Sequence, residues 1–427
     1  MPTAPQTLLR DMFQAAVDAA APEHRLAQFL PTPPKGRTIV VGAGKAAAAM
    51  AQVVERSWPA SHPLSGLVVT RYHHGVGPLP RIEIVEAGHP VPDEAGEAAA
   101  LRMLASVGGL NADDLVLCLM SGGASSLLAL PAPGISLDDK KRINRALLHS
   151  GAAIHEINSV RKHLSAIKGG RLAQAAAPAR LVTLMISDVP GDDPSVIGSG
   201  PTVPDESTLA DAREVLARYG IEAPESVAAR LRDVSYETPK PGDGAFKNTE
   251  HFIIATPQAS LEAAAVVARR RGITPLILGN AIEGEACEVA RVMAGIALQC
   301  AAHGQPATPP CVLISGGETT VTVRGRGRGG RNAEFLLALG VALNGHPAIH
   351  ALACDTDGID GTEDNAGALL APDSLRRAAG LGISARDRLS DNNGYGFFAS
   401  LDDLIITGPT RTNVNDFRAI LITPSES

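Results

Sequence analysis

Aromatic side chains are scarce in this sequence, at 3% of 427 residues, although 45% of the residues are hydrophobic. The hydrophobic cores must therefore be built mainly from Ala, Val, Leu and Ile. No stretch approaches the ~20 consecutive apolar residues that a membrane-spanning helix needs, so no membrane is expected as a partner. The chain also starts without a basic segment followed by an apolar one, which predicts no secretory signal and a cytoplasmic location.

Cysteine and positive charge are limited as well. The five cysteines are scattered and odd in number, which favours small buried residues of a reducing compartment over disulfides or a catalytic thiol. The formal net charge is −7, which argues against a nucleic acid as the main partner. A site for an anionic ligand must therefore be built from a local group of Lys and Arg residues.

Short apolar runs, each followed by a turn and in several cases by a helical stretch, recur along the chain. These runs are Ile39–Val41, Leu115–Met120, Leu181–Ile186, Phe252–Ala255, Cys311–Ile314 and Ala351–Cys354. Their alternation with helical stretches predicts an α/β protein with parallel, doubly wound sheets, in which ligands bind beyond the carboxyl ends of the strands. A polar segment rich in Pro and Gly at 237–244 indicates a linker, so we predict domains at 1–240 and 245–427.

Three glycine-containing turns that follow predicted strands are candidates for binding the phosphates of a nucleotide. In the first turn a helix start would offer unpaired amides to an anion, and in the other two small residues would let the backbone approach a ligand. Each turn alone also fits an ordinary connection, with Lys45 in solvent. The candidate residues are Gly42, Gly44 and Lys45, then Ser121, Gly122 and Gly123, and finally Ser315, Gly316, Gly317 and Glu318.

The first turn also fits the dinucleotide fingerprint, as Gly42-x-Gly44-x-x-Ala47. An NAD site would need an acidic residue at the end of the next strand. That strand ends at Arg71, which would suit only the 2′-phosphate of NADP.

Two acidic runs, 187–193 and 354–361, come directly after predicted strands. Carboxylates at strand ends can hold Mg²⁺ or take a proton from an attacking hydroxyl group. Asp188, Asp193 and Asp357 are therefore candidate metal ligands.

Two basic segments stand out in this acidic chain. In segment 158–171, Arg161 and Lys168 are candidates for binding the carboxylate of a small acid, although a solvated helix face would look the same. Segment 324–331 alternates Arg with Gly and predicts a flexible clamp for an anion, closed by Arg331 at a helix start. A solvated hairpin tip fits some of its arginines, and an RNA-binding tract is disfavoured by the net charge and by the lack of interleaved aromatics.

Six motifs along the chain resemble those of the glycerate 2-kinase family, also called the type II glycerate kinase or MOFRL family. They are Val41–Ala46, Asn158–Leu172, Ser187–Asp192, Gly329–Asn332, Asp355–Gly361 and Thr412–Asp416. The resemblance implies a larger Rossmann-like N-terminal domain, a smaller α/β C-terminal domain and an active site in the cleft between them. It also implies that ATP, with Mg²⁺, phosphorylates the 2-hydroxyl of D-glycerate to give 2-phospho-D-glycerate and ADP.

The same resemblance marks Lys45, Asp188 and Arg331 as the catalytic core. In phosphoryl transfer, cations stabilise charge on the moving group, and a carboxylate orients the hydroxyl or the metal. We assign the first role to Lys45 and Arg331 and the second to Asp188, as base or as metal ligand. Asn413, within the last motif, joins Arg161 and Lys168 as a candidate for binding the substrate.

Two positions depart from the family pattern. Ala124 and Arg411 stand where glycine is usual, and Arg411 places a long cation near a predicted ligand loop, which leaves the substrate range open.

Some members of this family are named hydroxypyruvate reductase, so an NAD(P)H-dependent reductase is the alternative function. A reductase would use the first glycine turn and Arg71, and would leave the other glycine turns and the acidic strand ends without a role. A Mg-nucleotide site would use all of them. The expected partners are therefore ATP and glycerate; the sequence is compatible with a homodimer but no feature of it predicts one.

The role of Lys45 leads to a first prediction. Lys45→Ala should lower kcat for ADP formation by about two orders of magnitude or more, because the transferring phosphoryl group loses a preorganised cation. Circular dichroism and thermal unfolding should show an intact fold. Near-normal turnover would contradict the assignment.

Overall fold

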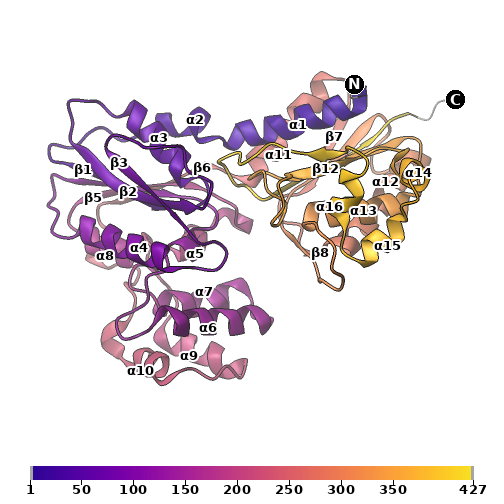
Figure 1. Ribbon diagram of the computed structural model, residues 1–427. Coiled ribbons are helices and arrows are strands. Elements are labelled where there is room, and N and C mark those ends of the chain that lie inside the picture. Colours follow the sequence, from indigo (N-terminus) through magenta and orange to yellow (C-terminus); the bar gives the residue numbers. More distant parts are fainter. Residues whose placement is uncertain (1–2, 425–427) are drawn as a thin grey trace. The chain divides into compact units, whose positions relative to one another are not determined.

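The computed structural model describes residues 3–424, which divide into two compact units (Figure 1). The N-terminal unit comprises Pro22–Ile254. The C-terminal unit comprises residues 255–424 together with residues 3–21. No helix within residues 3–424 is long and apolar enough to cross a bilayer.

A six-stranded sheet forms the centre of the N-terminal unit, with strand order β3-β2-β1-β4-β5-β6. β1 pairs in parallel with β2 and β4, and the parallel pairing continues from β2 to β3 and from β4 to β5. This order places the topological switch point between β1 and β4, where α/β sheets bind their ligands. The strands span Thr38–Ala43 (β1), Leu64–Arg71 (β2), Ile82–Ala87 (β3), Leu115–Met120 (β4), Arg180–Ile186 (β5) and Thr249–Ala255 (β6).

Helices cover both faces of this sheet, so its central strands are apolar along their whole length. β1 and β4 are buried at every residue. On one face α4, α5 and α8 pack into a shared core, and on the other α3 packs against the strands, with α2 beside it. These helices span Pro22–Arg25 (α2), Ala47–Ser57 (α3), Glu94–Val107 (α4), Ala124–Leu127 (α5) and Arg171–Ala176 (α8).

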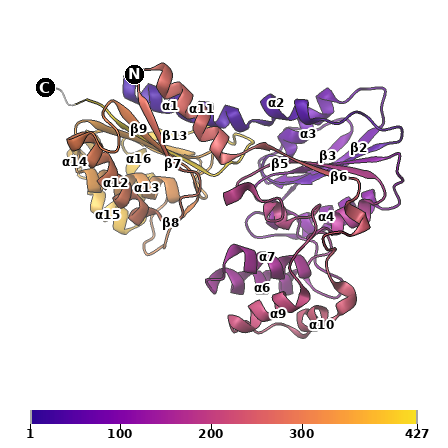
Figure 2. The ribbon, with the colours of Figure 1, turned by 180° about the vertical axis from the view of Figure 1, so that it is seen from behind.

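Four further helices of the N-terminal unit form a group with its own small core (Figure 1). Seen from either side, the group lies next to the face that α4 covers (Figure 2). Its members are α6 (Leu137–His149), α7 (Ile154–His163), α9 (Leu209–Arg218) and α10 (Glu225–Arg232).

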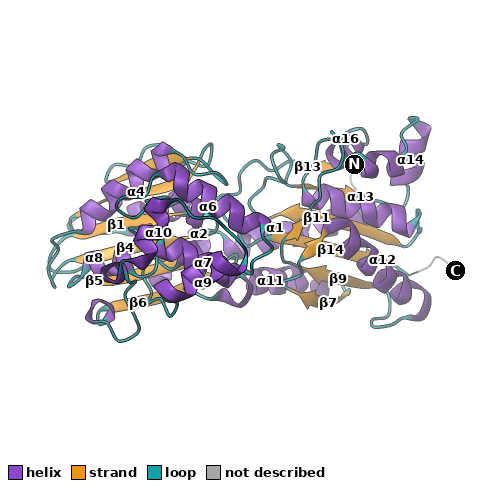
Figure 3. Cartoon of the chain, turned by 90° about the horizontal axis from the view of Figure 1, so that it is seen from below, coloured by secondary structure: helices purple, strands orange, loops and turns teal. Residues whose placement is uncertain are grey.

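The C-terminal unit contains a mixed six-stranded sheet of order β13-β12-β11-β14-β9-β7, whose strands lie side by side in Figure 3. Only β7 and β9 pair in parallel; β14 runs antiparallel to both β9 and β11. The strands span Thr274–Gly279 (β7), Cys311–Ser315 (β9), Ile349–Asp355 (β11), Gly367–Leu370 (β12), Leu404–Ile405 (β13) and Asp416–Ile422 (β14), and β8 (Gly284–Glu285) pairs separately with β10 (Thr319–Thr320).

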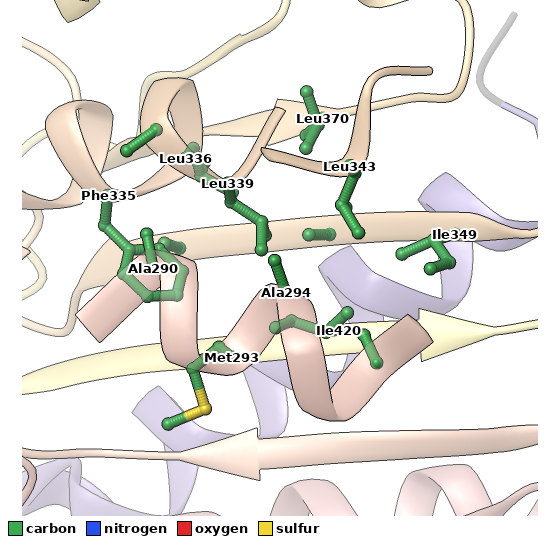
Figure 4. Packing of buried hydrophobic residues seen from close by; sticks show 14 of the residues in the cluster. Ala290, Met293, Ala294, Phe335, Leu336, Leu339, Leu343, Ile349, Leu370 and Ile420 are labelled. Carbon is green, nitrogen blue, oxygen red and sulfur yellow. The ribbon is translucent and has the colours of Figure 1, made fainter. Parts of the chain in front are cut away.

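Successive residues of these strands face opposite sides of the sheet and enter two different cores. Leu313 and Ile420 pack with α12 and α13, where Phe335 and Leu339 of α13 face Ala290 and Ala294 of α12 (Figure 4). The alternate residues pack with α1 and α11. The helices span Ala4–Ala20 (α1), Pro257–Arg270 (α11), Ala286–His303 (α12), Arg331–Leu343 (α13), Ser374–Gly380 (α14), Ala385–Ser390 (α15) and Gly394–Ala399 (α16).

All six apolar runs identified in the sequence are strands, and the α/β class is confirmed. Parallel pairing holds across the N-terminal sheet from β1 to β5, but it was the wrong expectation for the C-terminal sheet, which is mixed. The reason is β14, which returns to the sheet between β11 and β9. The five cysteines are free, and four of them are buried.

The structure divides the chain differently from the predicted ranges 1–240 and 245–427. After the linker the chain returns to the N-terminal sheet as β6, so the division falls at 254/255. Helix α1 belongs to the C-terminal unit, where Leu9 and Phe13 pack with Leu261 of α11. Helix α1 buries one apolar face, but periodicity alone does not identify the helix against which such a face packs.

Candidate active site

The first glycine turn and the Ser121 turn meet at the switch point between β1 and β4. Ser121 donates its amide to the carbonyl of Ala43 at 3.1 Å, and the amide of Lys45 donates to the carbonyl of Gly122 at 2.9 Å. The amide of Ala46 donates to Ser121 Oγ at 3.0 Å. The two predicted ligand turns are therefore bonded to each other.

The close approach of the neighbouring backbone explains why Gly42 and Gly44 are glycines. A Cβ at Gly42 would lie 2.1 Å from the carbonyl oxygen of Leu119, and one at Gly44 would lie 2.1 Å from Ser121 Oγ. The amide of Gly44 is itself bonded to the carbonyl of Val69 at 3.0 Å. The amides expected to bind phosphate at this turn are thus engaged within the protein, and nucleotide binding by the two glycines stays a prediction.

Lys45 projects from this junction toward the second turn. A Cβ at Gly123 would lie 3.5 Å from Cγ of Lys45 and 2.9 Å from Nε2 of His89. Gly123 has φ of 81°, in the left-handed region. Both features explain why glycine occupies this position, where the side chains of Lys45 and His89 pass close to the backbone.

A cavity of about 290 Å³ adjoins this junction. It brings together the two predicted substrate-binding residues, Arg161 and Lys168, with Gly123 of the second turn. Its walls are largely apolar. The remaining residues that line it include His89, Ser125 and Ser126 near the switch point, Lys140, Asn144 and Leu147 from α6, and Val160 and Leu164 from α7.

Lys140, Lys141, Arg161 and Lys168 line this cavity, and all of them except Lys141 are bonded to a neutral oxygen. Lys168 Nζ donates to the carbonyl of Gly198 at 3.2 Å, and Lys140 Nζ donates to the carbonyl of Leu130 at 3.2 Å. Arg161 Nε donates to Asn144 Oδ1 at 2.6 Å. Within residues 3–424 none of the three forms an ion pair with a carboxylate.

The pKa values of Lys140, Arg161 and Lys168 are all lowered by their surroundings. Burial, and then the charge of Arg161, lowers the pKa of Lys140 to about 7. Burial lowers the pKa of Arg161 to about 10. The pKa of Lys168 falls well below its usual value because of burial and then the nearby Lys140 and Arg161. An anion in the cavity would relieve this repulsion, so the cavity is suited to an anionic ligand.

Hydroxyl groups continue the polar lining. Ser125 Oγ lies 3.0 Å from Ser199 Oγ, which donates to Asn158 Oδ1 at 3.2 Å. Ser199 has φ of 62°, a strained conformation for a residue with a side chain. The rest of the basic segment is not a solvated face either, because Lys162 is buried and paired with Asp205 at 3.1 Å.

Asp188 and Asp193 follow β5, whose end lies at the same sheet edge as the two glycine turns. Asp193 is exposed and accepts bonds from the amide and hydroxyl of Ser195 at 2.8 and 3.0 Å, so it caps a turn. Among residues 3–424 no group of three or more His, Cys, Asp or Glu is arranged to hold a metal ion. A metal role for Asp193 stays a prediction that its present bonds do not favour.

Arg331 lies in the C-terminal unit, at the start of α13, and is held by three carboxylates. Its Nε donates to Asp416 at 2.8 Å, its second terminal nitrogen donates to Asp355 at 2.7 Å, and the first lies 3.0 Å from Glu318. These three charges raise the pKa of Arg331 against the opposing effect of burial. Arg331, which was predicted to bind an anion, is therefore already paired with carboxylates of the protein. One fifth of its side chain is exposed.

The carboxylates around Arg331 are themselves fixed. Asp416 also accepts from Asn332 Nδ2 at 2.8 Å and from the fully buried Arg418 at 2.6 Å. Asp360 accepts the amides of Asn332 and Ala333, both at 2.9 Å, and so caps the N-terminus of α13. The cluster orders the loop ends at this edge of the mixed sheet.

The other predicted residues of this unit lie near the same sheet edge. Asp357 is buried and accepts the amide of Ile359 at 2.8 Å, and Asn413 is buried. Gly317 packs against Ile282, where a Cβ would lie 2.2 Å from the backbone nitrogen.

Arg411 and Ala124, the two residues that depart from the family pattern, differ in backbone conformation and in burial. Arg411 is exposed with φ of 62°, which explains why glycine would be the usual residue there. Ala124 is buried at the start of α5.

Sequence reasoning missed Lys140, Asn144 and His89. Lys140 and Asn144 lie on α6, four residues apart, on the face of that helix that lines the cavity. That spacing was visible in the sequence, but nothing in it indicated that this face of α6 would meet Arg161.

Comparisons with known proteins agree with this fold. The sequence matches the domain of unknown function DUF4147 over residues 8–232 and the MOFRL family over residues 311–416. Together with the architecture, these matches define an α/β enzyme. The chain belongs to the glycerate kinase family, which carries these two domains.

Individual relatives bear two kinds of name. An *Agrobacterium vitis* protein provisionally named hydroxypyruvate reductase is 58% identical, over 97% of this chain and 94% of its own length. The D-glycerate 2-kinase of *Thermotoga maritima* is 40% identical, over 97% of this chain and 98% of its own length. The crystal structure of *Thermotoga maritima* glycerate kinase has a TM-score of 0.88 at 39% identity, covering 99% of this chain and all of that one.

The buried cap of α13 leads to a prediction about pH. Burial raises the pKa of Asp360 to about 6. The folded state therefore favours the protonated form, and this contribution to stability is present below pH ~4 and is lost as pH rises through ~6. Relative to Asp360→Asn, the wild type should lose about 2 kcal/mol of unfolding free energy between pH 4 and pH 7.

Urea unfolding followed by circular dichroism at the two pH values measures this difference. The readout is the change in the gap between the two proteins, so a constant offset caused by the substitution does not affect it. Asp402→Asn, at an exposed carboxylate of the same unit, is the control and should show no such change. A gap that is independent of pH would contradict the raised pKa.

Proposed function

We propose that this chain is an ATP-dependent D-glycerate 2-kinase, which transfers the γ-phosphate to the 2-hydroxyl and gives 2-phospho-D-glycerate and ADP. The observation that carries the proposal is the cavity in which Lys140, Arg161 and Lys168 lack carboxylate partners among the described residues, next to Lys45 at the switch point. A small acid supplies the missing negative charge. Its relatives named glycerate kinase support the choice of acid.

The candidate residues of the N-terminal unit have different roles in the proposed reaction. Arg161 and Lys168 bind the carboxylate of glycerate, and the apolar walls of the cavity strengthen that attraction. Lys45 stabilises the charge on the transferring phosphoryl group. Asp188, at the adjacent strand end, orients the 2-hydroxyl and accepts its proton, or binds the metal.

Magnesium fits this site as a partner of the nucleotide. Asp188 supplies a carboxylate, and Mg²⁺ is commonly held by one or two carboxylates together with substrate phosphates. Bound in this way, the ion would neutralise charge on the β- and γ-phosphates. This agrees with the lack, within residues 3–424, of a cage of three or more metal ligands.

Arg331 has a conditional role in this proposal. Each of its three side-chain nitrogens already contacts a carboxylate, so it can bind a phosphate only if that phosphate replaces one of them. Glu318 is the partner to replace, because its side chain is 55% exposed whereas Asp355 and Asp416 are buried.

An NAD(P)H-dependent hydroxypyruvate reductase is the second candidate. It is favoured by the provisional names of the *Agrobacterium vitis* relatives and by the Gly42-x-Gly44 turn. In a dinucleotide site the amides at this turn bind the pyrophosphate. Here the amides of Lys45 and Ala46 are bonded to the Ser121 turn, which speaks against a dinucleotide at this turn.

The decisive assay compares both activities on one sample of the purified chain. With ATP, Mg²⁺ and D-glycerate we expect ADP release and a product that enolase consumes directly, which identifies phosphorylation at the 2-hydroxyl. With hydroxypyruvate we expect no oxidation of NADH or NADPH. Oxidation of the nicotinamide without ADP release would overturn the proposal in favour of the reductase.

A further inference from the structure

The cavity holds more cationic groups than the single carboxylate of one glycerate molecule can pair. Lys140, Arg161 and Lys168 all line it, and none has a carboxylate partner among the described residues. A glycerate ion carries a single negative charge. One bound glycerate therefore leaves at least one of these groups without an anionic partner.

Lys141 is left out of this count. It also lines the cavity, but its Nζ lies 3.9 Å from Asp138 Oδ1, and its side chain is 26% exposed, so solvent and that carboxylate already screen its charge. Glu97 raises the pKa of Lys140 slightly from a distance, against the larger effects of burial and of Arg161. Lys140 thus forms no ion pair with a carboxylate among residues 3–424.

The ammonium group of Lys140 also has N–H donors available for a ligand. An ammonium group carries three N–H bonds, and Lys140 has one bond to the carbonyl of Leu130. Asn144, one turn further along α6, lines the same cavity and orients Arg161 through its Oδ1. Helix α6 therefore contributes a cation and a positioned guanidinium to one end of the cavity, beyond what the carboxylate of a small acid uses.

The cavity is also larger than a glycerate ion needs. A volume of about 290 Å³ lies near the lower end of the usual range for sites of drug-sized ligands. The largely apolar walls lower the local dielectric near the cations, which strengthens charge-assisted bonds to a phosphoryl group. A phosphoryl group brings about two negative charges and three acceptor oxygens, which together with one carboxylate match the three cations.

We propose that this cavity binds a small acid carrying a phosphoryl group more tightly than the same acid without it, and that Lys140 determines this preference. The proposal rests on the proposed function for the identity of the acid, which is then 2-phospho-D-glycerate. Its consequence is that the enzyme is inhibited by its own product, which competes with glycerate for the cavity.

Isothermal titration calorimetry on the full chain tests this with D-glycerate and 2-phospho-D-glycerate as probes. For the wild type we expect the phosphorylated acid to bind about tenfold more tightly or better, since two additional charge-assisted bonds form. Lys140→Gln should remove most of that advantage and change the affinity for D-glycerate by less than about threefold. Arg142→Gln, at an exposed residue of α6 that does not line the cavity, should behave as the wild type.

Two outcomes would overturn the proposal: equal affinity of the wild type for both acids, or an equal loss of both affinities in Lys140→Gln. The ratio of the two affinities is the readout, because a merely structural role of Lys140 would weaken both together. Thermal unfolding of each variant checks the fold. A failed kinase assay with the affinity ratio intact would refute the proposed function alone, whereas kinase activity without the ratio would refute this inference alone.

Discussion

Three cationic side chains share one cavity in the N-terminal unit, and the cost of keeping them there constrains how this unit is built. Lys168 is only 1% exposed, and Lys140 and Arg161 act on it as like charges. A buried charge without a partner costs several kcal/mol, which is comparable to the net free energy of unfolding of a whole domain. The protein offsets part of this cost with single neutral oxygens, from Gly198 and Leu130 among others.

In the C-terminal unit, by contrast, the buried cations are paired with carboxylates. Arg331 and the fully buried Arg418 both contact Asp416, and Arg331 has Asp355 and Glu318 in addition. Such a network holds its members in one geometry and leaves little charge for a ligand. The same chain therefore contains one cluster whose cations are paired with carboxylates and one whose cations have no carboxylate partner among the described residues, and the second is the better candidate for substrate binding.

Much of the fold could be predicted from the sequence because it depends on local pattern. The apolar runs that became β1, β4, β5, β9 and β11 are buried on both faces, and such strands read as continuous hydrophobic segments. The partners of α1, β6 and β14 could not be predicted, because they depend on which distant surface fits an apolar face. The turns after β1 and β4 were found as candidates, but not the bonds of Ser121 that join them.

The candidate site was predictable to a similar extent. Arg161 and Lys168 stood out as cations in an acidic chain, and the structure places both in one cavity with Gly123. Lys140 was missed because its helix carries several exposed charges, and only the packing of α6 against α7 distinguishes it from them. Asp193 was selected for its position after a strand, yet its bonds to Ser195 are those of a turn cap.

The central claim is that Lys168 is buried for a ligand and not for stability, and one substitution tests it most directly. Lys168→Met keeps the apolar stem and removes the charge, so the Tm should stay the same or rise, because an unpaired buried cation is lost. Calorimetric affinity for D-glycerate should fall by about tenfold or more. A lower Tm with unchanged affinity would contradict the account and make Lys168 a structural residue.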